Sequence, residues 1–196
     1  MDKKFIIDLS YLVMEYLDIL DQIKYKMIDK YNNYNLKIIY FGENYCKKKF
    51  ITQNILNKFP YIRKLYLRDS LNSLNLNYLK NLNYLKINDL CKIFYENINE
   101  LRQLEFLDAS YNMFLRKLPP SNIKILHIRG NKILRDKDIE HLDLIELDCS
   151  FTQNITKINH FKNLTKLIKS SDCPISQVEI DSLPNLKHIV NVDCIT

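Results

Sequence analysis

Three titratable residues, Asp108, His127 and Asp148, stand 19 and 21 residues apart in the chain. A carboxylate, an imidazole and a second carboxylate are groups that bind metal ions or transfer protons. However, the sequence places no nucleophile beside them, and a shallow, exposed surface neither excludes water nor shifts a pKa strongly. We therefore expect an ordinary hydrogen-bonded surface cluster. We expect no catalytic residue, no metal ligand and no cofactor-binding residue, and a protein that is not an enzyme.

Glycine is scarce in this sequence. The 196 residues include only Gly42 and Gly130, where average usage would give roughly fourteen. Phosphate-binding loops, dinucleotide-binding turns and nucleophile elbows each need several glycines at fixed spacing, so these classes of site are excluded. The hydrophobic fraction of 46% and the charged fraction of 27% are those of a folded globular chain.

Cysteine usage predicts the compartment. The five cysteines are odd in number and contain no CxxC pair, which favours reduced thiols in the cytoplasm over a disulfide framework or a zinc site. Asp8, Glu15 and Asp18 interrupt the apolar residues near the N-terminus, so we expect no signal peptide. No stretch approaches the roughly 20 apolar residues of a membrane helix, and we expect no membrane contact.

A repeat supplies the elements that hold these residues. The template LxxLxLxxN matches two clean copies that begin 19 residues apart, at Leu104 and Ile123, and end on Asn112 and Asn131. Weaker copies begin at residues 36, 62, 82, 144, 164 and 186. Each copy predicts one short strand and a short return. One such unit cannot bury its apolar face alone, so stacked units must form a solenoid with a continuous core.

This pattern resembles the leucine-rich-repeat family over residues 36–196. The resemblance implies an α/β fold, a curved parallel sheet of about eight short-return repeats, preceded by a small helical cap in residues 1–35. The template Asn residues, Asn44, Asn112 and Asn131, are expected to bond to the backbone of their neighbours at the turn out of the strand. Ser70, Thr152 and Cys194 are plausible substitutes, and we interpret Cys149, at an inward position, as structural. We expect distortion near Leu90 and over residues 171–174, one helix over residues 50–59, and extended or 3₁₀ returns elsewhere.

The resemblance also implies a concave face lined by columns of side chains. Template position five runs Tyr40, Tyr66, Lys86, Asp108, His127, Asp148, Ile168, Val190, and position three runs Ile38, Lys64, Tyr84, Phe106, Ile125, Glu146, Lys166, His188. Exposed aromatics among charges are typical of protein-binding surfaces. The sequence thus predicts a noncatalytic protein-interaction module. The residues expected to contact the partner are Tyr40, Lys64, Tyr66, Arg68, Tyr84, Lys86, Phe106, Asp108, His127, Arg129 and Asp148.

Residues 1–35 follow a helical pattern instead of the repeat template. The order Leu9 to Asp18, with Tyr16-Leu17-Asp18 closing the first apolar run, resembles the start of an F-box. That resemblance implies docking to a Skp1-type adaptor of a cullin-based ubiquitin ligase. The docking residues would be Leu9, Val13, Leu17 and Leu20. In the alternative, this segment is only a cap on a free-standing repeat scaffold.

Composition leaves three further expectations. Residues 36–70 hold eight Lys and Arg against Glu43 and Asp69, and this basic patch makes nucleic-acid binding a less favoured alternative. The high content of Asn, Ile, Lys and Tyr is similar to that of proteins from amoebal giant viruses. This similarity implies that the protein lies inside an infected host cell. The chain ends almost on the predicted strand Ile189 to Val192 without an evident cap, and such an uncovered edge predicts self-association.

Overall fold

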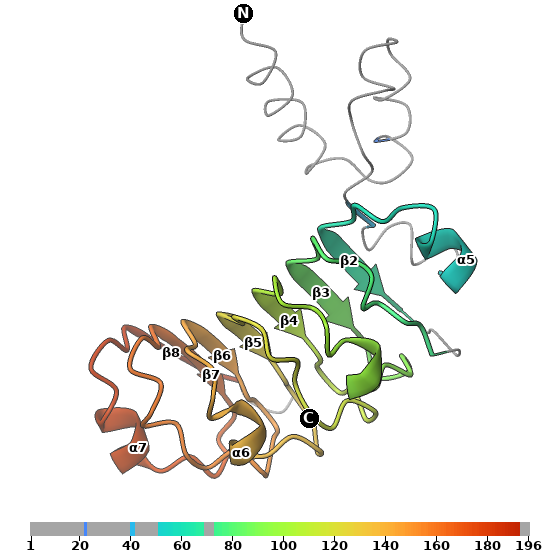
Figure 1. Ribbon diagram of the computed structural model, residues 1–196. Coiled ribbons are helices and arrows are strands. Elements are labelled where there is room, and N and C mark those ends of the chain that lie inside the picture. The colour runs from blue at the N-terminus through green and yellow to red at the C-terminus, as the bar shows by residue number, and fades with distance from the viewer. Residues whose placement is uncertain (1–21, 23–39, 42–50, 69–72, 193–196) are drawn as a thin grey trace, which may run out of the picture.

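The computed structural model describes residues 22, 40–41, 51–68 and 73–192, and over these it has one parallel sheet whose eight strands follow the chain order β1 to β8 (Figure 1). Each strand therefore pairs with the next one in the sequence, as the repeat predicts. The strands are β1 (Tyr40–Phe41), β2 (Lys64–Leu67), β3 (Tyr84–Ile87), β4 (Phe106–Asp108), β5 (Ile125–His127), β6 (Glu146–Asp148), β7 (Lys166–Lys169) and β8 (His188–Asn191).

The core is a stack of leucines, one from each central strand. The paired register places Leu65, Leu85, Leu107, Leu126, Leu147 and Leu167 in a row, and all six are 0% exposed. Burying a leucine side chain contributes about 1.5–3 kcal/mol, and each of these leucines is covered by the repeats on either side. The sheet is therefore stabilised only as a stack.

Short helices lie on the opposite side of the stack from the strands (Figure 1). They are α5 (Gln53–Leu56), the 3₁₀ helix η1 (Tyr95–Asn97), α6 (Asp136–Ile139) and α7 (Gln177–Asp181). The prediction of a helix over residues 50–59 was too long, because α5 is one turn that begins after its N-cap Thr52. The single turns α6 and α7 were not predicted. The short segment between two strands has room for one helical turn. The turn α6 places Ile139 in the core, and the turn α7 places Ile180 there.

Asn112 bonds to the turn of the preceding repeat, as predicted. Its side-chain nitrogen donates to the carbonyl oxygens of Asn88 at 2.7 Å and Cys91 at 2.9 Å. Its side-chain oxygen accepts from the backbone N–H groups of Phe114 at 3.0 Å and Leu115 at 2.9 Å. The buried amide thus satisfies backbone groups of two repeats at once.

Asn131 repeats the arrangement one strand later. Its amide nitrogen donates to the carbonyl oxygen of Asn112 at 2.9 Å, and its oxygen accepts from the N–H groups of Ile133 and Leu134. The protein therefore has one parallel strand in each repeat, a stack of leucines in the core, and an asparagine ladder, in which the side chains of Asn112 and Asn131 each bond to the repeat before. The fold is a leucine-rich-repeat solenoid.

The two repeats expected to be distorted do depart from the ladder. β3 and β7 are four residues long, while β4, β5 and β6 are three. After β3 and β7 the turn comes one residue later than after β4 and β5. Cys91 and Cys173 therefore occupy the position that Asn112 and Asn131 hold in their own repeats, and their N–H groups donate to the carbonyl oxygens of Asn88 and Ser170. The exposed Leu90, at the template position, is displaced outward.

Thr152 substitutes for asparagine only in part. Its hydroxyl donates to the backbone carbonyl oxygen of Cys149 at 2.7 Å, so it bonds a backbone group at the turn after β6, but in its own repeat. Asn44, Ser70 and Cys194 lie outside the described residues, so their predicted ladder roles stay predictions.

The pairing of β1 with β2 differs from the predicted register, so Tyr40 has a different neighbour from the one predicted. Tyr40 pairs with Lys64 and Phe41 with Leu65, whereas the template alignment had placed Tyr40 beside Tyr66. A slip of two residues leaves every side chain on its original face, so alternation could not distinguish the two registers. From β2 to β8 the register is as predicted. The boundary at residue 36 stays a prediction because residues 23–39 are outside the described part.

Candidate functional site

An aromatic stack lies on the strand face that points away from the leucine core. Tyr84 of β3 and Phe106 of β4 occupy paired positions, and their rings stack with centroids 4.0 Å apart and planes 4° apart. His127 of β5 meets the edge of Phe106, with ring centroids 5.3 Å apart. Parallel strands lie about 4.8 Å apart, so the register itself produces the stack. All three side chains remain partly exposed.

A cation lies beside this stack on the Tyr84 side. The Lys86 ammonium is 3.2 Å from a carboxylate oxygen of Asp108 and 5.5 Å from the centre of the Tyr66 ring. Partial burial acts to lower the pKa of Lys86, but the Asp108 carboxylate outweighs it, so the pKa of Lys86 lies above its ordinary value. Lys86 is therefore held as a fixed cation.

On the other side of the stack, Glu146 of β6 contacts both His127 and Lys166. One of its carboxylate oxygens is 3.0 Å from His127 Nε2 and 3.0 Å from Lys166 Nζ. Burial acts to raise the pKa of Glu146, but the hydrogen bonds from Lys166 and His127 outweigh it, so the pKa lies below its ordinary value. The imidazole is thereby fixed against both Glu146 and Phe106.

Asp108, His127 and Asp148 occupy paired strand positions, as predicted. Their polar atoms bond elsewhere. Asp108 faces Lys86, His127 bonds to Glu146, and Asp148 accepts from the N–H at 3.0 Å and the hydroxyl at 2.7 Å of Ser150. Within the part of the chain that the structure describes, no three His, Cys, Asp or Glu side chains gather in a way that could hold a metal ion. The three residues form separate hydrogen bonds and ion pairs, and Asp108 and Asp148 are buried, at 7% and 8% exposed, which the expectation of an exposed surface cluster had not anticipated.

Turn residues extend the strand face beyond the predicted columns. Tyr111, Gly130 and Phe151 follow three successive strands at the same template position, and all adopt left-handed backbone angles, with φ of 58°, 61° and 58°. The Arg129 guanidinium lies 4.9 Å from the centre of the Phe151 ring, a cation–π contact. Sequence reasoning predicted Arg129 but missed Tyr111 and Phe151, although their common template position was a usable signal.

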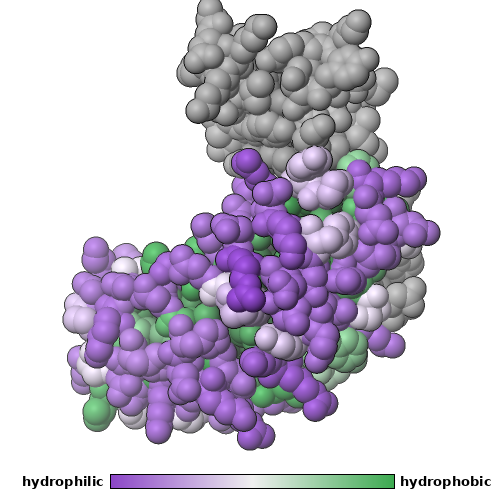
Figure 2. Space-filling view, in the orientation of Figure 1, coloured by the Kyte–Doolittle hydropathy of each residue, from purple (hydrophilic) through white to green (hydrophobic). Residues whose placement is uncertain are grey.

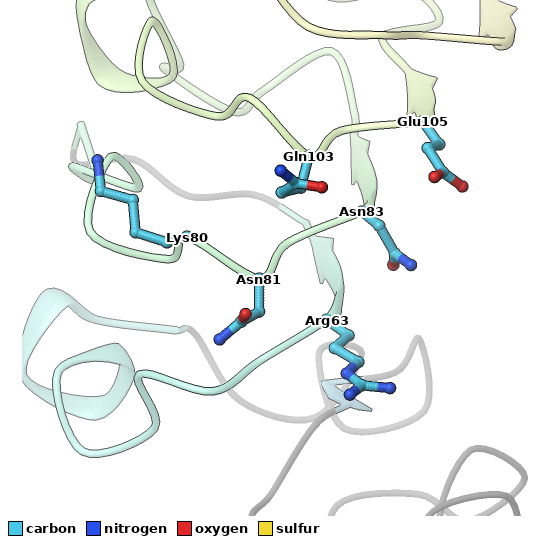
Figure 3. Close-up of a pocket in the computed structure, with 6 residues that line it drawn as sticks. All are labelled: Arg63, Lys80, Asn81, Asn83, Gln103 and Glu105. Carbon is cyan, nitrogen blue, oxygen red and sulfur yellow. The ribbon is translucent and has the colours of Figure 1, made fainter.

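Two shallow hollows open where the central strands begin. One, of about 320 Å³, is lined only by polar side chains from the segments that lead into β2, β3 and β4 (Figure 3): Arg63, Lys80, Asn81, Asn83, Gln103 and Glu105. The other, of about 190 Å³, shares Asn83 and Glu105 but also includes Tyr84, Phe106 and Ile125. The aromatic stack thus borders a cavity. Neither Asn83 nor Glu105 was among the predicted partner-binding residues.

The remaining predicted residues divide between described and undescribed segments. Lys64 lies beside the smaller hollow, Tyr66 is nearly buried, and Arg68 is exposed just after β2. Tyr40 is placed by its backbone pairing alone. Outside the described residues lie most lysines of the basic patch and the adaptor-docking candidates Leu9, Val13, Leu17 and Leu20.

The visible face of the molecule is mostly hydrophilic, with separate apolar patches (Figure 2). Among the described helices, none is long and apolar enough to cross a membrane.

No protein-family model matches the sequence, and no curated protein is significantly similar to it. Among solved structures, the chain is similar to internalin C2 from Listeria monocytogenes, with 20% identity and a TM-score of 0.47 over 74% of this chain and 78% of that one. It is also similar to internalin F from the same organism, with 20% identity and a TM-score of 0.36 over 86% and 72%. At these values neither structure assigns a family or a function.

Proposed function

We propose that this protein is a noncatalytic protein-interaction module whose partner binds the strand face. The observation that carries the proposal is the aromatic stack of Tyr84 and Phe106, partly exposed and fixed between two ion-pair clusters. Large aromatic side chains held rigidly in this way lose little entropy on binding and contribute much of an interface's energy.

The polar surroundings favour a protein segment as the partner. The hollow beside Tyr84, Phe106 and Ile125 has the size for one apolar side chain of a partner, not for a large cofactor. Lys86 and Lys166 flank the stack as positioned cations. Each of these cations is already paired with a carboxylate, so a segment with one apolar anchor and polar groups around it would suit both features, since polar complementarity fixes orientation.

Affinity purification with matched variants tests this function. The full chain, a Phe106→Ala variant and a Val178→Ala variant are used as baits, and the recovered proteins are quantified by mass spectrometry. Val178 is 77% exposed on α7, on the other side of the solenoid, and serves as the control. We expect a partner recovered by the full chain and by Val178→Ala and lost with Phe106→Ala. Partners that all survive Phe106→Ala would contradict the strand-face site.

A more specific role rests on the N-terminal sequence. We propose that residues 1–35 dock a Skp1-type adaptor through Leu9, Val13, Leu17 and Leu20, which would make the chain a substrate receptor of a ubiquitin ligase. The alternative is a free-standing scaffold in which this segment is a cap. Recovery of the adaptor by the full chain and its loss with a truncated chain that lacks residues 1–35 but still folds would support the receptor role. Absence of the adaptor from both samples would favour the scaffold.

We also propose a cytoplasmic location and self-association at the last strand. Among the described residues, Cys91, Cys149 and Cys173 form no disulfide, which suits a reducing compartment. Ile189 of β8 continues the row of core leucines, yet it is 45% exposed. Within the described part of the chain no further strand pairs with β8, and an apolar side chain on such an edge favours pairing with the same edge of a second copy.

A further inference from the structure

Two thiols from neighbouring repeats meet in the core. Cys149 directly follows β6 and is 0% exposed, and Cys173 follows β7 at the ladder position and is 6% exposed. Their sulfur atoms are 3.8 Å apart. A disulfide bond is about 2.05 Å long, so an approach of less than about 2 Å would join them. Both are free cysteines in this structure.

The surroundings make the two thiols unequal. The side-chain contact with Cys149 lowers the pKa of the Cys173 thiol to about 7, and a hydrogen bond with the backbone of Ile175 acts in the same direction, against the effect of burial. The same contact, together with burial, raises the pKa of Cys149. Of the two, Cys173 is therefore the thiol that loses its proton more readily.

The charged groups around the pair act in the same direction. The side chain of Lys169, at the end of β7, favours the anionic form of Cys173. The carboxylate of Asp148 disfavours an anion on Cys149. Reactivity toward oxidants follows thiolate character and access. Both thiols are buried, and of the two Cys173 has the lower pKa and the larger exposed fraction, 6% against 0% for Cys149.

We propose that Cys149 and Cys173 form an intramolecular disulfide when the protein meets hydrogen peroxide. The Cys173 thiolate attacks one peroxide oxygen, the O–O bond breaks, and the departing hydroxide takes up a proton to become water. Cys173 is then a sulfenic acid. The Cys149 sulfur, on losing its proton, attacks the Cys173 sulfur, the S–O bond breaks, and the hydroxide leaves as a second water with that proton. Two thiols are oxidised and one peroxide is reduced to two waters.

The bond would link two repeats of the solenoid. The two cysteines are 24 residues apart, and they join the turn after β6 to the turn after β7. Closing such a loop restricts the unfolded chain more than the folded one. The oxidised protein should therefore melt at a higher temperature than the reduced one, and the transition should return to its original position on addition of dithiothreitol.

Tryptic mapping of the full chain tests the proposal directly. Cleavage after Lys and Arg places each of the five cysteines in a separate peptide, with Cys149 in residues 138–157 and Cys173 in residues 170–187. The reduced protein is treated with hydrogen peroxide, remaining thiols are blocked with N-ethylmaleimide, and the digest is analysed without reductant. We expect the two peptides as one species whose mass is their sum less two hydrogens.

Two variants and the pH dependence sharpen the result. Cys91→Ser removes another buried thiol and should leave the link unchanged, while Cys149→Ser should abolish it and leave Cys173 oxidised without a partner. Because the thiolate form of Cys173 attacks, the rate of linking should rise from pH 6 to pH 8, as Cys173 loses its proton. A link from Cys173 to Cys46 or Cys194, further oxidation of Cys173 in the unaltered chain, or unreacted thiols at both positions would overturn the proposal. The mapping of the unaltered chain decides the question even where a variant fails to fold.

Discussion

The ring of Tyr111 lies directly over the backbone of Gly130 in the next repeat, where it fills the space that a β-carbon would occupy. Both residues stand at the same template position, and both have left-handed backbone angles, with φ of 58° and 61°. The N–H of Tyr111 donates to the carbonyl of Arg129 at 2.7 Å. One of the two glycines in the sequence is therefore needed for a close approach between neighbouring turns.

Gly130→Ala should destabilise the protein. A β-carbon would overlap the Tyr111 ring, and alanine at this positive φ carries backbone strain, so we expect a loss of about 1–3 kcal/mol in the free energy of unfolding. Urea unfolding measures it. In a Tyr111→Ala background, the same change should cost only the backbone part, about 1–2 kcal/mol. An equal cost in both backgrounds would show that the ring contact contributes nothing.

Asn131→Ala should be among the more harmful single changes. It leaves the N–H groups of Ile133 and Leu134 and the carbonyl of Asn112 without their side-chain partner. Each unsatisfied buried polar group costs about 1–3 kcal/mol, so we expect a loss of about 3 kcal/mol in denaturant unfolding. Asn159→Ala, at an exposed position, is the matched control and should change stability by less than about 0.5 kcal/mol. Comparable losses in the two variants would refute the ladder argument.

The contribution of Glu146 to stability should depend on pH. Its pKa is lower in the folded chain than in the unfolded one, because hydrogen bonds from Lys166 and His127 favour the carboxylate despite burial. The stabilisation is therefore fully present above the unfolded pKa, about 4.3, and is lost as the pH falls through the lower, folded value. The difference in unfolding free energy between the protein and Glu146→Gln should be large at pH 6 and shrink below pH 4.

The Lys80–Glu100 pair supplies a control for that pH series. Its charged atoms are 3.9 Å apart, and both side chains are more than half exposed. Exposed pairs contribute little to stability, so Glu100→Gln should behave like the unaltered protein from pH 3 to pH 7. A pH-independent difference for Glu146→Gln would mean that the two cations do not stabilise its carboxylate.

Self-association should depend on the last strand. Sedimentation velocity at increasing concentration is expected to reveal a dimer that Ile189→Lys abolishes, because a buried lysine would oppose apolar pairing of the two β8 edges. Val178→Lys, which adds the same charge at an exposed site on α7, should leave the dimer intact. A strictly monomeric profile at high concentration would remove the idea.

The sequence by itself determined the repeat, the number of strands and most of the register. Leu107, Leu126 and Leu147 recur at intervals set by the chain's own returns, and parallel neighbours can only align them side by side. The asparagines Asn112 and Asn131 were predicted for the same reason. The order of side chains at template position three also implied that Tyr84 and Phe106 would be neighbours, because that order depends only on which strands pair.

The tertiary structure decided what the period leaves open. A slip of two residues in β1 preserves every face, so only pairing with β2 placed Tyr40 beside Lys64. One-residue extensions of β3 and β7 moved Cys91 and Cys173 into the ladder, because a template of fixed spacing has no place for an inserted residue. The meeting of Cys149 with Cys173 follows from that shift, and no motif in the sequence marks it, because contacts between repeats depend on turn geometry and not on the order of residues.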